Sequence, residues 1–521
     1  MPADHVVFPS TLIGVQLDPR QGLSKQLYAV LRERILDGRL SGATRLPASR
    51  DLAKSLAISR NSVMRAYDQL YAEGFIEGRV GDGTYVAQLS SSRPALQDNP
   101  GRKLSTNLST GLPTGLCTAL STESAENPAD IGEQVIHSRA MKLIESHQLR
   151  DPSGEGPKAF RVGVPAFDLF PFALWGRLYA AFWRRPDLHQ LGYGAAAGEW
   201  HLRELIAVYL RSSRGLHCRA EQIVITSGAQ HAISLCAQLL LAPGEAVAVE
   251  NPGYRAAGHA FAVAGARLQG VAVDAEGMRC ADLDQSDCRL AYVTPSHQYP
   301  TGVVMSLARR LELLAWAEKN QSWIVEDDYD GEYRYSGAPL APLAALDQTG
   351  RVLYVGTFGK IAFPALRLGY LVLPAALVQP FSQRKAVDMR HTEISVQAVM
   401  AQFMAAGHFQ RHIRRMRRAA LSRRDALLAG WPENNIAGCQ AMPRVVAGLH
   451  VMVKVDSVAR EQALIAKAMS VGVEMNALSE YWLPDSCEPI DNRAGLVLGF
   501  AAVPEPAIAD ALNRLRVAWS E

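Results

Sequence analysis

The sequence lacks the features that are typical of secreted proteins, of membrane-spanning proteins and of proteins with structural metal sites. Its seven cysteines are odd in number, scattered, and never in C-x-x-C spacing, which argues against a disulfide framework or a zinc site and indicates a reducing compartment. No uninterrupted apolar run approaches the ~20 residues that a membrane helix needs. The N-terminus has no basic start followed by an apolar core. We therefore expect a cytoplasmic protein with no metal site and no membrane contact.

The chain also has little excess charge of either sign. It holds 54 Lys and Arg residues and 51 Asp and Glu residues, which leaves a net charge of +3. A large basic surface is absent from this total, so any surface that binds nucleic acid must be local. Hydrophobic residues make up 48% and charged residues 20%, as in globular proteins, and 521 residues are too many for a single ordinary core. We therefore expect at least two domains.

Residues 20–88 predict a winged helix-turn-helix domain of the α+β class. An apolar stripe of helical spacing over 23–36 is followed by a short helix over 49–56, a tight turn and a second helix over 60–73. Two short strands joined by the turn Gly81-Asp82-Gly83 come next. In such domains the start of the second helix meets base edges while the preceding elements contact the backbone.

This segment resembles the N-terminal domain of the GntR family of bacterial regulators. The resemblance is carried by L-P-A-S-R over 46–50, S-R-N-S-V over 59–63, G-F-I-E over 74–77 and G-D-G-T-Y-V over 81–86. The alternative is a small helical domain for protein contacts, with its arginines on a solvated face. The resemblance and the exposed start of the second helix together imply DNA contacts from Arg45, Ser49, Arg50, Ser59, Arg60, Asn61, Ser62, Arg65, Gly81 and Gly83.

The composition changes twice after this domain. From residue 89 to residue 158 it shifts to Ser, Thr, Pro, Asn and Gly with little periodicity, which predicts a flexible linker. From 159 to 521 buried strands alternate with helices, which is typical of an α/β domain with a mostly parallel sheet. Ligands of such sheets sit at the carboxyl ends of the strands.

Five of the predicted strands end in motifs that carry chemistry. They are S-G-A-Q over 227–230, N-P-G-Y over 251–254, P-S-H-Q-Y-P-T-G over 295–302, E-D-D-Y-D-G-E over 326–332 and T-F-G-K over 357–360. The last motif delivers Lys360 beside the apolar residues Ile361, Ala362 and Phe363. An apolar setting disfavours the protonated amine, and a depressed pKa is what an imine-forming lysine requires. The alternative is an ordinary surface lysine.

The remaining motifs supply the other groups that pyridoxal 5'-phosphate (PLP) chemistry needs. Asp327 is the candidate for keeping the pyridine nitrogen protonated, Tyr329 for donating to the ring oxygen, and Tyr254 for stacking on the ring. The predicted phosphate ligands are Gly228, Ala229, Gln230, Thr357 and Arg367, and His297 or Gln298 is expected near the ring. Singly, each has a structural alternative as a helix cap, a core aromatic or a turn.

The order of these motifs resembles the fold type I aminotransferase domain. Joined to the GntR-like head, it is similar to the MocR/GabR subfamily of regulators. The resemblance implies the PLP-dependent transferase fold, with a large domain over about 159–400 and a small α+β subdomain over about 401–521. It also implies a head-to-tail homodimer, since aminotransferase-like domains form their sites at a two-fold interface.

Two positions depart from the aminotransferase pattern. Gly359 stands where a Ser or Ala commonly precedes the lysine. In the predicted strand over 492–501, position 497 is Val where aminotransferases place an arginine that binds the substrate carboxylate. Arg493 or Arg444 could serve from elsewhere, so the sequence leaves open whether the chain is an enzyme.

The resulting hypothesis is a PLP-dependent transcriptional regulator. Lys360 would hold PLP as an internal aldimine, a small amine or amino-acid effector (or PLP itself) would shift the large domain, and the linker would transmit the change to the heads on promoter DNA. One alternative is an active class I/II aminotransferase with an accessory DNA-binding head, and another is a regulator with a vestigial pocket. The basic residues over 410–424 predict a solvated helix of the small subdomain. The alternative is an auxiliary patch that contacts phosphates.

Overall fold

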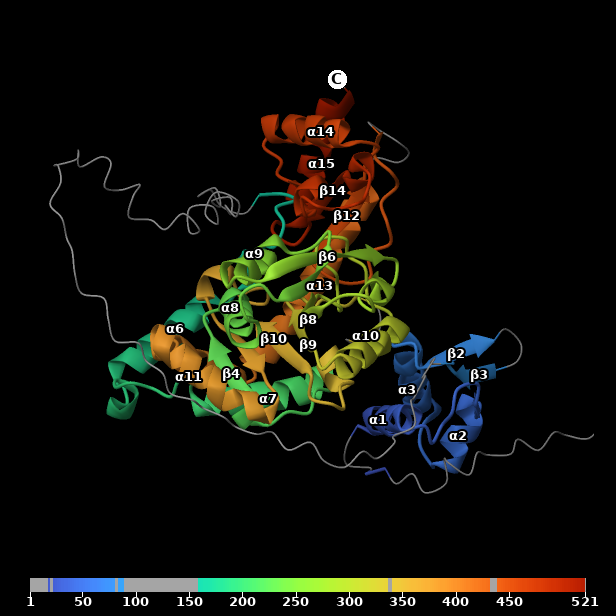
Figure 1. Cartoon of the computed structure of the whole chain (residues 1–521), viewed down its shortest axis with the longest axis vertical. Coiled ribbons are helices and arrows are strands. Elements are labelled where there is room, and N and C mark those ends of the chain that lie inside the picture. The colour runs from blue at the N-terminus through green and yellow to red at the C-terminus, as the bar shows by residue number, and fades with distance from the viewer. Residues whose placement is uncertain are drawn as a thin grey trace, which may run out of the picture. The chain divides into compact units, whose positions relative to one another are not determined.

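The structure is a computed structural model that describes residues 17–18, 22–79, 83–88, 158–335, 340–431 and 438–520 (Figure 1). Gly81 and all but the last residue of the predicted linker lie outside these ranges, so both stay predictions. Within the described ranges, no helix has the length and apolar character that a membrane crossing requires.

The N-terminal domain is a winged helix-turn-helix. Its elements are α1 (Leu23–Leu36), β1 (Arg45–Leu46), α2 (Ser49–Ser55), α3 (Arg60–Ala72), β2 (Ile76–Arg79) and β3 (Gly83–Val86). The three strands form an antiparallel sheet in the order β1-β3-β2. Leu27 and Leu31 of α1 are fully buried, as are Val63 and Leu70 of α3. This shared apolar core confirms the fold expected for the head.

Local hydrogen bonds determine where α3 begins and how it sits. The hydroxyl of Ser59 accepts a hydrogen bond of 3.1 Å from the backbone amide of Ser62, so Ser59 is the N-cap. The buried hydroxyl of Tyr67 donates to the carbonyl oxygen of Pro47 at 2.8 Å, which ties α3 to the turn before α2. The exposed start of α3 is therefore capped by Ser59, and the helix is joined to the turn before α2.

The C-terminal part is built on an eight-stranded sheet in the order β4-β11-β10-β9-β8-β5-β6-β7. Its strands are β4 (Ile223–Thr226), β5 (Ala246–Asn251), β6 (Arg267–Asp274), β7 (Gly277–Met278), β8 (Cys288–Val293), β9 (Trp323–Asp328), β10 (Val352–Thr357) and β11 (Gly369–Val372). β11 runs antiparallel to both β4 and β10, and β7 antiparallel to β6, while the other six strands share one direction. This confirms a mostly parallel sheet.

Helices cover both faces of this sheet. Alternate residues of β10 show this, because Leu353 and Val355 pack in the cluster that contains α8 and α9, whereas Tyr354 packs with α7 and α12. The helices of this domain are α6 (Phe172–Arg184), α7 (Trp200–Arg214), α8 (Ala229–Leu240), α9 (Arg255–Val263), α10 (Leu307–Lys319), α11 (Val378–Met389) and α12 (Ile394–Ala405). The near-continuous apolar runs of the strands follow from this double coverage.

A smaller α+β unit follows. A long helix, α13 (His408–Gly430), leads to the antiparallel sheet β12-β14-β13 and two further helices. Their bounds are β12 (His450–Lys454), α14 (Val458–Ser470), β13 (Asn476–Ala477), β14 (Gly495–Gly499) and α15 (Glu505–Ser520). Phe409 of α13 packs in the core of the large domain and Leu427 in the core of the small one. Phe160 pairs with Gly499 of β14, so the segment at the start of the C-terminal part also belongs to the small core.

Candidate functional site

The predicted site residues gather at one edge of the large sheet. β4, β5, β8, β9 and β10 point the same way, so their carboxyl ends meet at a common edge. The antiparallel β11 begins at that edge, which brings in Arg367, two residues before its first strand residue. Residues spread over more than a hundred positions thereby share one location.

Lys360 is partly buried at this edge. Its Nζ donates a hydrogen bond of 2.8 Å to the carbonyl oxygen of Gly163. Burial lowers the pKa of Lys360 from its usual value, partly offset by the charges of Asp330 and Asp327. Gly163 has a φ of +81°, and a Cβ there would lie 3.0 Å from Nζ, so glycine makes room for the amine. This is the setting that the sequence predicted for an imine-forming lysine, with Gly163 as an unpredicted neighbour.

Asp327 lies near the end of β9 with only 4% of its surface exposed. Its Oδ2 accepts a hydrogen bond of 2.7 Å from the hydroxyl of Tyr292, while its buried Oδ1 has no partner among the described residues. Burial raises the pKa of Asp327 to about 7, although the hydrogen bond from Tyr292 and the charge of Lys360 act in the opposite direction. A buried carboxylate oxygen without a donor is costly, so a ligand N–H placed there would be stabilised.

Two tyrosines lie beside these groups. Tyr254 follows β5, is 37% exposed, and meets the ring of Tyr299 edge-on at 5.6 Å between centroids. The hydroxyl of Tyr329 donates to the carbonyl oxygen of His297 at 2.8 Å. Tyr254 thus retains an exposed surface on which a flat ring could stack, whereas Tyr329 would have to exchange a backbone acceptor for a ligand oxygen.

His297 and Gln298 are both buried and hydrogen-bonded within the protein. Nδ1 of His297 lies 3.0 Å from Oδ2 of Asp330, and its ring centroid lies 4.6 Å from that of His450. The side-chain nitrogen of Gln298 donates to the carbonyl oxygen of Pro252 at 2.9 Å. His297, Asp330 and His450 hold potential metal-ligand atoms within 4.8 Å of one another, and Nε2 of His450 also lies 3.1 Å from the carbonyl oxygen of Pro300. That one of the two approaches a cofactor ring stays a prediction.

The predicted phosphate ligands meet where β4, β10 and β11 come together. Gly228, with a φ of +81°, is the N-cap of α8, whose first amides come from Ala229 and Gln230. The guanidinium of Arg367 donates to the carbonyl oxygen of Ser227 at 3.0 Å, and the hydroxyl of Thr357 accepts from the amide of Gly359 at 3.1 Å. A helix start beside a guanidinium and a hydroxyl is a favourable place for a phosphate.

Side chains that the sequence motifs did not indicate contact the strand ends and the loop that carry the site residues. Arg214, in the last turn of α7, forms a fully buried ion pair with Asp328, which also accepts a hydrogen bond of 2.6 Å from the hydroxyl of Tyr354. Nε2 of the buried His412 in α13 donates to the carbonyl oxygen of Ile361 at 2.8 Å, and burial lowers the pKa of His412 to about 4, so the ring is neutral. These contacts fix the end of β9 and the loop after Lys360.

No arginine of β14 faces the site among the described residues. Val497 is fully buried in β14 between Met452 and Asn476. The guanidinium of Arg493 donates to the carbonyl oxygens of Glu488 and Ser486, and Arg444 is exposed. β14 itself therefore offers no arginine that could bind a substrate carboxylate.

Most of the predicted contact residues of the head are exposed. Arg60, Asn61 and Arg65 are exposed on α3, and Nε of Arg60 reaches the hydroxyl of Ser49 at 3.4 Å. The pairing of β1 with β3 brings Arg45 to the wing, where a Cβ on Gly83 would lie 3.2 Å from its Nε. The other predicted residues that the structure describes are Arg50, which is exposed, Ser59, the N-cap, and Ser62, whose hydroxyl lies 2.8 Å from that of Ser59.

Two family descriptions match the chain. "Bacterial regulatory proteins, gntR family" matches residues 23–86, and "Aminotransferase class I and II" matches residues 189–477. The chain is 33% identical to the probable rhizopine catabolism regulatory protein MocR of Rhizobium meliloti, covering 95% of this chain and 94% of that protein. It is 29% identical to the pyridoxine biosynthesis transcriptional regulator PdxR of Corynebacterium glutamicum, covering 95% and 96%.

The structure is similar to those of PLP-dependent aminotransferases. The crystal structure of Pyrococcus horikoshii kynurenine aminotransferase, in complex with PMP, matches with a TM-score of 0.64 at 26% identity. The match covers 75% of this chain and 98% of that one. The aminotransferase-like domain therefore accounts for most of the chain, and the head is an addition to it.

Proposed function

The chain belongs to the MocR/GabR subfamily of GntR-family transcriptional regulators, and on that basis we propose that it senses a small amine through PLP held at Lys360. The chain combines a DNA-binding head with an aminotransferase-like domain of fold type I. This fold and its structural neighbours imply the use of PLP. The residues that hold it, the effector and its coupling to the head are our proposal.

The observation that carries the proposal is the unpartnered carboxylate oxygen of Asp327. A buried acceptor in a strand that pairs with the one leading to Lys360 fits the protonated nitrogen of a pyridine ring. The phosphate of the same molecule would lie at the start of α8, between Arg367 and Thr357. PLP supplies an aldehyde that condenses with amines, conjugated to a ring that withdraws electrons.

The chain's own residues would set the state of that ligand. Burial keeps the amine of Lys360 more easily deprotonated, and Gly163 orients it with a hydrogen bond. Tyr254 would cover one face of the ring, and Tyr292 holds the carboxylate of Asp327 in place. Since β14 offers Val497 where amino-acid transamination needs an arginine, these residues favour reversible sensing of an amine over rapid turnover.

We further propose that the protein works as a head-to-tail homodimer in the cytoplasm, where promoter DNA is present. Aminotransferase-like domains build their sites at a two-fold interface, and a dimer would present two heads to a promoter.

Sensing is tested by following PLP and DNA together. Candidate amines and amino acids are titrated into the purified, PLP-loaded protein while the visible absorbance and the affinity for the neighbouring promoter fragment are recorded. We expect one class of amine to change both over the same concentration range, with DNA affinity shifting about 5-fold or more. Fast exchange of an amino group with a keto acid, unaffected by deleting residues 1–90, would instead favour the aminotransferase alternative. An amine that changes the absorbance without changing DNA affinity would contradict the sensing proposal.

The role of Asp327 is tested by Asp327→Asn, which keeps the shape and removes the charge. We expect the Kd for PLP to rise about 10- to 100-fold, because a charged hydrogen bond contributes about 1.5–3 kcal/mol. Absorbance titration with PLP measures this, with the exposed Asp284→Asn as the matched control. An unchanged Kd would show that Asp327 does not contact the ring.

A further inference from the structure

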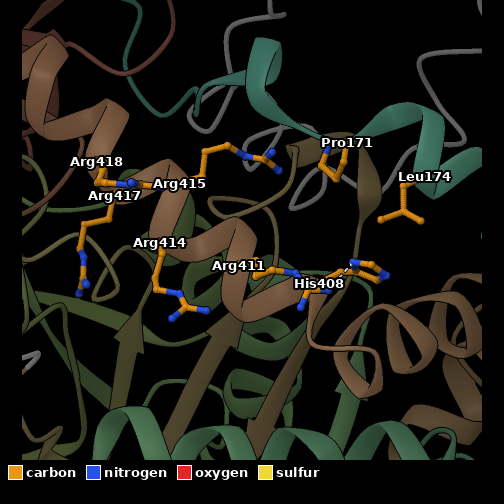
Figure 2. A pocket seen from close by; sticks show the side chains of 8 residues that line it. All are labelled: Pro171, Leu174, His408, Arg411, Arg414, Arg415, Arg417 and Arg418. Atoms are coloured by element: carbon orange, nitrogen blue, oxygen red, sulfur yellow. Dashed lines mark hydrogen bonds between the residues drawn. The ribbon is translucent and has the colours of Figure 1, made fainter.

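A surface hollow of about 710 Å³ lies along the first half of α13, and none of its lining residues is assigned to PLP. Five of its lining residues are arginines, and the others are His408 of α13 together with Pro171 and Leu174 (Figure 2). The arginines are Arg411, Arg414, Arg415, Arg417 and Arg418. None of the lining residues is acidic.

These arginines have no carboxylate partner among the described residues. Arg411 donates to the carbonyl oxygen of Ala406 at 3.0 Å and lies 2.9 Å from Nδ1 of His408, and Arg415 lies 3.3 Å from Nδ1 of His412. Further along the same helix, by contrast, Arg423 pairs with Asp168 and Arg424 with Asp425. The first half of α13 therefore carries an uncompensated positive charge that the second half does not.

Such a cluster costs stability unless an anion neutralises it. Like charges three and four residues apart on a helix repel one another, and Arg411, Arg414, Arg415 and Arg418 have this spacing. They extend over about 10 Å of the helix at 1.5 Å per residue. A row of exposed guanidinium groups of this length matches an extended polyanion better than a single small anion, which would need buried donors converging on one point.

We propose that the five arginines that line the hollow, here called the arginine row, bind the phosphate backbone of duplex DNA outside the segment contacted by the head. The chain belongs to a family of DNA-binding regulators, on which this proposal rests. DNA is the polyanion that the protein is built to meet, and backbone contacts of this kind raise affinity without reading sequence. The aminotransferase-like domain would then be a second DNA-contacting body as well as a sensor.

The test uses the full chain and a triple substitution, Arg414→Gln, Arg417→Gln and Arg418→Gln. Affinity is measured by fluorescence anisotropy as a function of salt concentration, on the promoter fragment and on a series of shorter duplexes. The shortest duplex contains only the bases that the head contacts, which are identified by their loss of protection in Arg60→Ala. The matched control replaces three other basic side chains of the same domain by Gln: Arg211, Arg219 and Lys319. Visible absorbance with PLP and thermal unfolding report whether each variant is folded and loaded.

On the long fragment, we expect the triple variant to lose about 10-fold or more in affinity. The slope of log K against log salt should fall by about 3, since each phosphate contact contributes about 0.9. On the shortest duplex the variant should equal the wild type, which also shows that the head's function is intact. Equal affinity and slope on all lengths, the same loss at every length, or the same loss in the control variant would each overturn the proposal.

Discussion

Replacing Lys360 by alanine is expected to abolish covalent capture of PLP completely. Wild-type protein incubated with PLP should absorb in the visible range, and borohydride should fix a label that peptide mass spectrometry places on Lys360. The variant should stay colourless and unlabelled, because a methyl side chain leaves no amine at this edge of the sheet. Its DNA affinity should no longer respond to effector amines, while basal binding by the head persists.

A second buried lysine makes this prediction discriminating. Lys385 of α11 is buried, burial lowers its pKa to about 8, and its Nζ donates to the carbonyl oxygen of Ala196 at 2.6 Å. It therefore resembles an activated amine, yet it lies outside the predicted site. Lys385→Met and the exposed Lys319→Ala should both keep the label. A label that survives in Lys360→Ala and maps to Lys385 would refute the assignment.

The double substitution Arg60→Ala and Asn61→Ala is expected to lower affinity for the promoter about 100-fold or more. Both side chains are exposed in the first turn of α3, and each base contact typically contributes about 1–3 kcal/mol. The ratio of specific to non-specific binding should fall as well, because base contacts carry sequence information that phosphate contacts do not. Anisotropy with promoter and scrambled duplexes at one salt concentration measures both quantities.

The control for the head is Arg39→Ala. Arg39 is exposed after α1 and forms an ion pair with Asp37. The substitution therefore removes one positive charge outside the predicted contact residues. It should leave promoter affinity nearly unchanged. Both variants should take up PLP like the wild type. An unchanged specificity ratio in the double variant would mean that another part of the head reads the bases.

Much of the fold could be predicted because its signals are local. The apolar runs that become β4, β5, β8, β9 and β10 are each followed by a motif, and the head's helices and wing follow one another in a short segment. The antiparallel insertion of β11 was not predicted, because an apolar strand pattern does not indicate strand direction. That insertion is what brings Arg367 beside Gly228.

Only some residues of the candidate site could likewise be predicted from the sequence. Lys360 and Asp327 stand in motifs at strand ends, so sequence alone could indicate them. Gly163, Arg214 and His412 act on residues that are 197, 114 and 51 positions away along the chain, and only the folded arrangement reveals these contacts. The depressed pKa expected for Lys360 agrees with the structure, in which Ile361 and Ala362 are buried and Phe363 is half-buried.

The length of α13 has a mechanical consequence. A rigid rod of 23 residues is about 34 Å long, and it is anchored in two separate cores, at Phe409 and at Leu427. If an occupied pocket tilts the smaller core by ten degrees about the larger one, the far end of the rod sweeps about 6 Å. His412 lies near the fixed end of α13 and would hardly move. A small change beside Lys360 would therefore produce a much larger displacement at the far end of the helix.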